Sequence, residues 1–226
     1  MESNFDCRIS YDEFGWKHAF FPIVTRYSPV VVPDTPSVLL TKNPLSALSS
    51  LYSYARSNPK NIRSAAAQDF RSFLRRPVVI FDGSNQYSAE YRFVSAVEYW
   101  NSMNWNLHSI VRKRPEAMHV RYEDLLADPE RALTPLAERH GLKRTTVDFI
   151  IPSKRMNNLP DQQHNQEKFF SKRNYVADDY LASFEEDDLR FVARHLCLPL
   201  VRKLGYMEIY EKHLAPLTIR KPSHGG

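Results

Sequence analysis

Cysteine and long apolar runs are both scarce in this 226-residue chain. The two cysteines, Cys7 and Cys197, are too few and too far apart in sequence to indicate a disulfide framework or a zinc site. No apolar run approaches the roughly 18 residues that span a bilayer, and residues 1–6 are acidic and polar, unlike a secretory signal. We therefore expect a cytoplasmic protein of a reducing compartment that does not enter a membrane.

Glycine is scarce as well, and its positions argue against one kind of nucleotide site. The six glycines are Gly15, Gly83, Gly141, Gly205, Gly225 and Gly226. None of them begins a glycine-rich run of the kind that cradles phosphates between a strand and a helix. A nucleotide kinase depends on such a loop and its lysine, so the sequence disfavours that activity.

Charge of both signs is abundant, and the balance is mildly basic. Lys and Arg number 31 against 26 Asp and Glu, which gives a formal net charge of +5 at pH 7. This balance suits an anionic ligand but does not by itself indicate nucleic-acid binding, which is the weakest candidate function. The length and the apolar share of 42% fit one domain over residues 1–226, with flexible tails at 1–13 and 215–226.

Apolar periodicity predicts strands that alternate with helices. Strands are expected at 14–21, 38–41, 78–81 and 117–121. Helices are expected at 44–56, 91–111, 129–140, 145–151 and 185–203, with a helical patch at 65–74 inside a surface segment at 57–76. This alternation is typical of an α/β fold with a parallel sheet.

A candidate phosphate site lies where the strand at 38–41 leads into the helix at 44–56. Pro44 suits a first helical position, and the exposed amides at such a helix start favour an anion. Lys42 before the turn and Ser50 two turns into the helix could hold one phosphate from two sides. The alternative is an ordinary turn, because Asn and Pro often mark turns for purely local reasons.

A second block follows the strand at 117–121. It reads Arg121-Tyr122-Glu123-Asp124-Leu125 and leads through Asp128-Pro129 into a helix that ends near Gly141-Leu142. Acids at a helix start are favoured by about 0.3–1 kcal/mol, so a structural role is expected for this block. Two further segments are considered together with these blocks: Tyr99-Trp100-Asn101 lies upstream and Leu204-Gly205-Tyr206 lies downstream.

Together these segments resemble the sulfotransferases that use 3'-phosphoadenosine 5'-phosphosulfate (PAPS). The resemblance covers residues 14–206 and implies a three-layer α/β/α fold with a central parallel sheet, related to the P-loop NTPases. It implies PAPS or its product PAP as the nucleotide co-substrate, and no metal. Lys42 and Ser50 stand where the family has the arginine and the serine that hold the 3'-phosphate.

The resemblance also implies catalytic residues. His18 would be the base that takes the acceptor proton, Lys17 a contact of the sulfonate, and Lys172 and Arg173 further nucleotide contacts. The family pattern separates its lysine and histidine by one residue, whereas Lys17 and His18 are adjacent. Successive strand residues face opposite sides, so either the strand ends there or one of the two faces the site. A structural role for His18 is the alternative.

One family element is missing from the sequence. No segment resembles the Pro-Lys/Arg-Ser-Gly-Thr-Thr loop that holds the 5'-phosphosulfate, so the first strand-loop-helix unit is expected to be absent. Truncation, divergence with loss of activity, or a loop supplied by another chain would each explain this. Two functions stay open: sulfonate transfer from PAPS to a hydroxyl or amine of a small-molecule or carbohydrate acceptor, and a non-catalytic binding or scaffold role. A second copy of the chain is a candidate partner in both cases.

Four aromatic residues are candidates for an acceptor pocket. Aromatic side chains at helical spacing more often belong to a core, which is the alternative for this set. The residues are Tyr87, Tyr91, Trp100 and Trp105.

Overall fold

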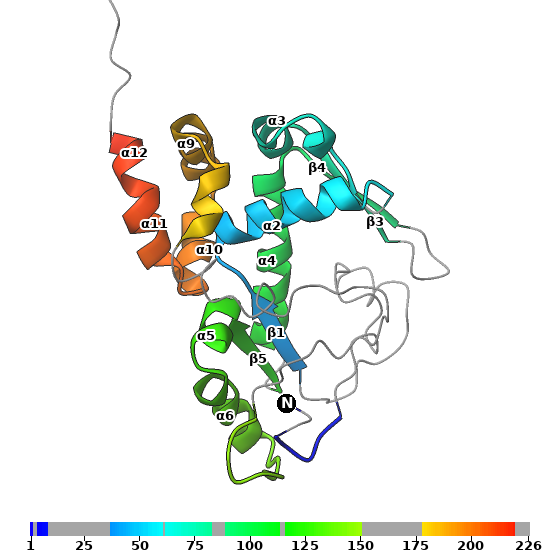
Figure 1. Ribbon diagram of the computed structural model, residues 1–226, viewed down its shortest axis with the longest axis vertical. Coiled ribbons are helices and arrows are strands. Elements are labelled where there is room, and N and C mark those ends of the chain that lie inside the picture. Colours follow the sequence, from blue (N-terminus) through cyan, green and yellow to red (C-terminus); the bar gives the residue numbers. More distant parts are fainter. Residues whose placement is uncertain are drawn as a thin grey trace, which may run out of the picture.

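The computed structural model describes residues 1, 4–8, 37–60, 62–82, 89–113, 116–150 and 178–219 (Figure 1). In chain order the elements are β1 (Ser37–Thr41), α2 (Pro44–Ser57), β2 (Ile62–Arg63), the 3-10 helix η1 (Ala65–Ala67), α3 (Phe70–Arg75), β3 (Val78–Asp82), β4 (Ala89–Phe93), α4 (Ala96–Lys113), β5 (Ala117–Arg121), α5 (Tyr122–Ala127), α6 (Pro129–Arg139), the 3-10 helix η2 (Asp179–Ser183), α9 (Glu186–His195), α10 (Leu198–Lys203), α11 (Met207–His213) and α12 (Ala215–Ile219). The mixed α/β class is therefore confirmed.

The strands at 37–41 and 117–121 form a parallel pair. Their register runs from Ser37 opposite Ala117 to Thr41 opposite Arg121, so both strands end at the same edge. The chain enters α2 from β1 after Lys42 and Asn43, and β5 passes directly into α5. The expected parallel pairing is thus present, and it brings the starts of α2 and α5 together.

The other described strands form a separate antiparallel sheet in the order β2-β3-β4. The sequence predicted a central parallel sheet, and the described strands agree with this only in part, because the second sheet is antiparallel. The helix expected at 91–111 is corrected as well, because residues 91–93 belong to β4. Ser95 explains where the helix begins: its Oγ accepts a hydrogen bond from the backbone N–H of Glu98 at 3.1 Å.

Helix α4 is the central element of the main core. It contacts β1, β4 and β5 as well as α2, α3, α9 and α10, and Figure 1 shows it running through the middle of the molecule. Its residues Val97 and Trp100 are buried. The helix therefore links the parallel pair, the antiparallel sheet and the C-terminal helices.

Residues 57–76 contribute to this core, although the sequence predicted a surface segment. Phe70, Phe73 and Leu74 of α3 are buried, and the ring of Phe73 lies 5.5 Å from that of Tyr52 on α2. Asp69 begins α3 by accepting a hydrogen bond from the backbone N–H of Ser72 at 2.6 Å. The helical patch expected at 65–74 is present as η1 and α3, but it packs into the core rather than lying on the surface.

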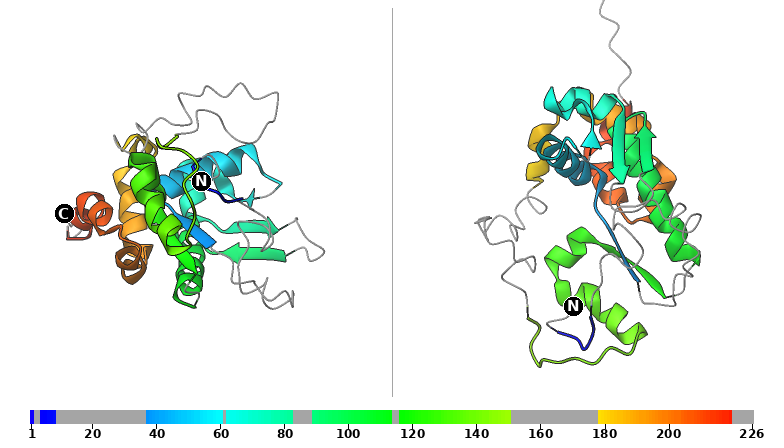
Figure 2. Two further views of the ribbon diagram at one scale, coloured as in Figure 1. Left: turned by 90° about the horizontal axis from the view of Figure 1, so that it is seen from below. Right: turned by 90° about the vertical axis from the view of Figure 1, so that its right-hand side faces the viewer.

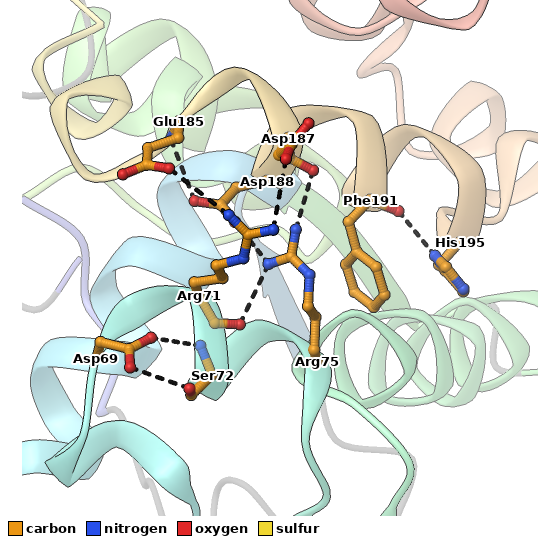
Figure 3. A network of polar contacts seen from close by, with 9 residues as sticks. All are labelled: Asp69, Arg71, Ser72, Arg75, Glu185, Asp187, Asp188, Phe191 and His195. Carbon is orange, nitrogen blue, oxygen red and sulfur yellow. Dashed lines mark hydrogen bonds and ion pairs between the residues drawn. The ribbon is translucent and has the colours of Figure 1, made fainter. Parts of the chain in front are cut away.

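Helix α3 is joined to α9 by a cluster of ion pairs (Figure 3). The guanidinium of Arg75 lies 2.5 Å from a carboxylate oxygen of Asp188, which is only 2% exposed. Arg71 forms longer, exposed contacts with Glu185 and Asp187. Figure 3 shows the two arginines reaching from α3 to the first turn of α9.

The helix expected at 185–203 is divided into α9 and α10. Asn101 on α4 lies beside the division. Its Nδ2 donates to the carbonyl of His195 at 2.8 Å, and its Oδ1 accepts from the N–H of Cys197 at 3.0 Å. One side chain thus satisfies backbone groups that a continuous helix would have paired internally.

A second, smaller cluster of apolar residues surrounds α6. Phe5, Leu133 and Ala137 are its buried members. The first residues of the chain lie beside α6, at the end of the molecule away from α3 (Figures 1 and 2). Residues 4–8 of the predicted N-terminal tail therefore pack against the fold, and Ala215–Ile219 of the predicted C-terminal tail forms α12.

The helix expected at 145–151 does not form over its described residues, 145–150. Instead, Asn4 pairs with the backbone of Ile150, donating to its carbonyl at 2.8 Å and accepting from its N–H at 2.6 Å. The expected strand at 14–21 lies outside the described residues. Among the helices of the described part of the chain, none has the length and apolar character needed to cross a bilayer.

Candidate functional site

The candidate site is built around Lys42 and Ser50, which the fold brings together. The ammonium of Lys42 donates a hydrogen bond of 2.6 Å to Oγ of Ser50, eight residues later and two turns into α2. The ring of Tyr122, the first residue of α5, lies 5.2 Å from the same ammonium, within the range of a cation–π contact. The pair lies where the carboxyl end of β1 meets α2 and α5.

Burial changes the electrostatics of this lysine. Desolvation lowers the pKa of Lys42 from 10.5 to about 8, and the nearby carboxylate of Glu123 partly opposes the effect. The ammonium is therefore protonated at pH 7 but holds its proton weakly. An incoming anion would stabilise the charged form.

The start of α2 is already occupied by protein groups, contrary to the expectation of exposed amides. The backbone N–H and the Nδ2 of Asn43 each donate to Oε1 of Glu123 at 2.9 Å. The side chain of Asn43 accepts from the N–H of Ser46 at 2.9 Å, and both residues are only 1% exposed. A phosphate at this place would meet the side chains of Lys42 and Ser50 rather than the helix amides.

A chain of hydrogen bonds runs from Glu123 across the parallel strands. Oε2 of Glu123 accepts from the hydroxyl of Tyr206 at 3.2 Å. That hydroxyl lies 2.9 Å from Oγ1 of Thr41, which in turn lies 2.5 Å from Nε2 of His119. We call Asn43, Glu123, Tyr206, Thr41 and His119 the polar relay.

Two titratable members of the polar relay, Tyr206 and His119, are perturbed toward the neutral form. Burial, together with the charge of Glu123, raises the pKa of Tyr206 well above its usual range. Burial lowers the pKa of His119, and the charges of Arg121 and His108 lower it further.

Arg121 connects the end of β5 to the end of α10. Its Nε and Nη2 donate to the two carboxylate oxygens of Asp124 at 2.7 and 2.6 Å, and its Nη1 donates to the carbonyl of Gly205 at 2.6 Å. Gly205 has a φ of +76°, a left-handed conformation that glycine adopts without strain. The bidentate pair and the glycine together fix the orientation of the guanidinium.

An open groove lies beside Arg121. It has a volume of about 320 Å³, and we call it the β5–α10 groove. Its walls come from β5, α5, α6 and the end of α10, and the lining residues are Met118, His119, Val120, Arg121, Asp124, Ala132, Lys203, Leu204 and Gly205. Neither Lys42 nor Ser50 belongs to this lining, although the polar relay connects the two places.

No family model, curated protein or solved structure matches this chain. Its function is therefore inferred from its own residues and their geometry. Of the predicted site residues, the structure brings Lys42 and Ser50 together. Lys17, His18, Lys172 and Arg173 lie outside the described residues.

The four aromatic residues proposed for an acceptor pocket have different positions. Trp100 is only 4% exposed, and its indole N–H donates to the carbonyl of Lys42 at 3.2 Å, so it supports the site from the core. Tyr91 is half-buried against the main core, and Trp105 is 36% exposed on α4. Tyr87 lies outside the described residues.

The contribution of the relay residues was not predicted from the sequence. A structural role at the start of a helix was expected for Tyr122 to Asp124, whereas Glu123 contacts the residue next to Lys42. The available signal was the parallel pairing itself, because the carboxyl ends of neighbouring parallel strands meet at one edge. Residues that follow Thr41 and Arg121 must therefore lie close together.

Proposed function

We propose that this chain is a sulfotransferase-like protein that binds the 3'-phosphate of PAPS or PAP between Lys42 and Ser50. The observation that supports the proposal is the 2.6 Å contact between the Lys42 ammonium and the Ser50 hydroxyl. A cation and a hydroxyl that converge from a strand end and a helix flank can both bind one phosphate oxygen or neighbouring oxygens. Ligands of α/β proteins commonly bind at the carboxyl ends of parallel strands.

The surroundings of Lys42 suit an anion held on the flank of α2. Glu123 places negative charge at the helix start, which keeps a second anion away from the amide of Asn43. Its hydrogen bonds to Asn43 also hold the backbone next to Lys42 in place. Partial desolvation strengthens the attraction between an ammonium and a phosphate relative to water.

In a catalytic cycle the acceptor hydroxyl or amine would attack the sulfur of PAPS. The bond between that sulfur and the bridging phosphate oxygen would break, PAP would leave, and the acceptor proton would pass to His18. Lys17 would stabilise the transferred sulfonate, and Lys172 and Arg173 would contact the nucleotide. These roles, and a three-layer α/β/α sulfotransferase-like fold that lacks its first strand-loop-helix unit, form part of the proposal.

Calorimetric titration with PAP tests the nucleotide site. Adenosine 5'-phosphate is the matched ligand because it lacks the 3'-phosphate. We expect Lys42→Ala with Ser50→Ala to weaken PAP binding by about 10- to 100-fold while changing adenosine 5'-phosphate little, since charge-assisted hydrogen bonds contribute roughly 1.5–3 kcal/mol. Ser53→Ala, an exposed serine of the same helix, serves as the control.

The nucleotide proposal fails if the wild type does not bind PAP. It also fails if the double variant binds PAP as tightly as the wild type does.

A non-catalytic binding role is the second candidate. The observation that favours it is the lack of a Gly-Thr-Thr loop for the 5'-phosphosulfate in the sequence. A transfer assay with radiolabelled PAPS and mixed phenols, sugars and amines separates the two functions. Turnover that His18→Ala abolishes supports the transferase, whereas PAP binding without turnover supports the binding protein.

A further inference from the structure

We propose that the β5–α10 groove is a second ligand site, which binds a small organic acid with an apolar body and a single negative charge. This site shares no lining residue with the Lys42–Ser50 pair, so the inference does not depend on nucleotide binding. An aromatic carboxylate such as benzoate represents the expected ligand class.

The size and lining of the groove fit such a ligand. Its volume of about 320 Å³ is at the lower end of the range of roughly 300–1,000 Å³ for small-molecule sites. Met118, Val120 and Leu204 give apolar surface, whereas His119 and Arg121 give polar groups. A few polar groups among apolar walls are the usual composition of a ligand site.

The position of the groove leaves room for a ligand along β5. Among the described residues, β5 pairs only with β1, so no described strand covers its other edge. Ala132 of α6, a small residue, also lines the groove. A larger side chain there would reduce the volume available to a ligand.

Charge selects an anion over a neutral compound. The positive charge of Arg121 is balanced by Asp124, while Lys203 forms no ion pair with any described residue. The lining therefore carries one net positive charge, provided by Lys203. Burial lowers the pKa of His108 on α4, and the nearby positive charges of Lys203 and Arg112 lower it further.

The polar groups of the groove are held in place before any ligand arrives. His119 is held through Nε2 by Thr41 at 2.5 Å, and Arg121 is held by Asp124 and Gly205. Fixed side chains lose little conformational entropy when they bind a ligand. Arg121 and His119 are therefore polar side chains of fixed orientation in the groove, and Lys203 supplies the electrostatic attraction for the anion.

Ligand-observed NMR with the full chain tests the site, using benzoate and the neutral benzyl alcohol as matched probes. We expect benzoate to bind with a Kd on the order of 1 mM, a value suited to a fragment of this size, and benzyl alcohol to bind several times more weakly. Lys203→Gln should weaken benzoate binding about fivefold, as expected for loss of one partly screened charge. Arg202→Gln removes the same charge from the neighbouring exposed residue that does not line the groove, and should change little.

Ala132→Leu is the second variant, and it should block binding by filling the groove. Lys42→Ala should leave benzoate binding unchanged, which separates this site from the nucleotide site. The proposal is overturned if benzoate does not bind, if benzyl alcohol binds equally well, or if Arg202→Gln weakens binding as much as Lys203→Gln does. Unchanged binding in both Lys203→Gln and Ala132→Leu would overturn it as well. Should Ala132→Leu fail to fold, the Lys203→Gln comparison decides alone.

Discussion

At the scale of single residues, Lys42 is a cation held in surroundings that disfavour its charge. Burial lowers its pKa to about 8, and the hydroxyl of Ser50 and the ring of Tyr122 are neutral partners. Perturbed titratable groups of this kind concentrate at functional sites. The half-buried ammonium therefore lowers the stability of the fold at pH 7 while it favours the binding of an anion.

Replacing this lysine by a neutral side chain of similar length is expected to stabilise the protein at pH 7. The proton is lost near pH 8 in the folded chain but only near pH 10.5 in the unfolded chain, so wild-type stability rises with pH between these values. Lys42→Met should be more stable than the wild type by about 1–2 kcal/mol at pH 7, and the difference should shrink by pH 10. Urea denaturation at both pH values measures it. A Lys42→Met variant that is less stable than the wild type at pH 7 would contradict this account.

The same pKa predicts the pH dependence of nucleotide binding. PAP requires the protonated ammonium, whose fraction in the free protein falls as pH rises through about 8. Affinity for PAP should therefore drop by about tenfold between pH 7 and pH 9. Titration calorimetry across this range gives the profile.

Lys42→Arg is the matched control for this experiment. A guanidinium keeps its proton throughout the range, so the variant should bind PAP with little change between pH 7 and pH 9. An equal loss of affinity in the wild type and in Lys42→Arg would mean that another group titrates.

At the scale of elements, side-chain contacts decide where helices begin, end and meet. The pair of Arg75 and Asp188 joins α3 to α9, and Asp188 also accepts from the backbone N–H of Glu185 at the start of α9 at 3.2 Å. The guanidinium of Arg75 stacks 4.8 Å from the ring centre of Phe191 (Figure 3). One carboxylate thus serves both as a helix cap and as an ion-pair partner.

The two arginines of α3 should differ sharply in their effect on stability. Arg75→Ala leaves the buried carboxylate of Asp188 without its partner, so we expect a loss of about 3 kcal/mol. Arg71→Ala removes exposed contacts to Glu185 and Asp187, so we expect less than about 1 kcal/mol. Urea denaturation measures both. Equal losses of unfolding free energy in the two variants would show that the burial of Asp188 does not determine how much its ion pair stabilises the protein.

Local sequence signals predicted several elements well. Helix α6 begins at Pro129 after the cap Asp128 and ends before Gly141, which has a φ of +62°. β1 and β5 were predicted from short apolar runs, and α2 from Pro44 with its apolar spacing. These signals lie within a few residues of the element that they define.

Elements whose limits depend on distant partners were predicted poorly. Asn101 lies beside the break between α9 and α10, and Asn4 pairs with the backbone of Ile150 where a helix was expected. Neither partner is visible in the local pattern. Strand β4 was assigned to a helix because Tyr91 and Phe93 also fit helical spacing with α4.

In the candidate site, too, local contacts were predicted and contacts between residues distant in sequence were not. Lys42 and Ser50 are joined by one turn and one helix, so their spacing predicts that they meet. Glu123 contacts Asn43 from 80 residues away, and that contact follows from the pairing of β1 with β5 rather than from local spacing. Distance along the chain, not the chemistry of the residues, limited the prediction.

At the scale of the whole molecule, most buried apolar residues of the described part of the chain belong to two separate clusters. The larger one includes residues of α2, α3, α4 and the C-terminal helices, whereas the smaller one joins Phe5 to α6. Phe5 also lies edge-on to Phe149, with ring centres 6.4 Å apart. A small cluster with few members should open more easily than the main core.

Phe5→Ala is expected to weaken the region around α6 selectively. Loss of a buried phenylalanine costs about 3–5 kcal/mol in a core, and here the cost should fall on the smaller cluster. Amide hydrogen exchange should accelerate in residues 129–139 while exchange in α4 changes much less. Equal acceleration in both regions would show instead that the molecule unfolds as a single unit.

The indole of Trp100 makes the Lys42 site observable without a label. Its N–H binds the carbonyl of Lys42, so it is in direct contact with the backbone of the residue proposed to receive the phosphate. Any shift of that backbone on ligand arrival would alter the polarity around a buried fluorophore. Tryptophan fluorescence should therefore report whether a ligand occupies the Lys42 site. The change in emission should be lost in Trp100→Phe if Trp100 is its source.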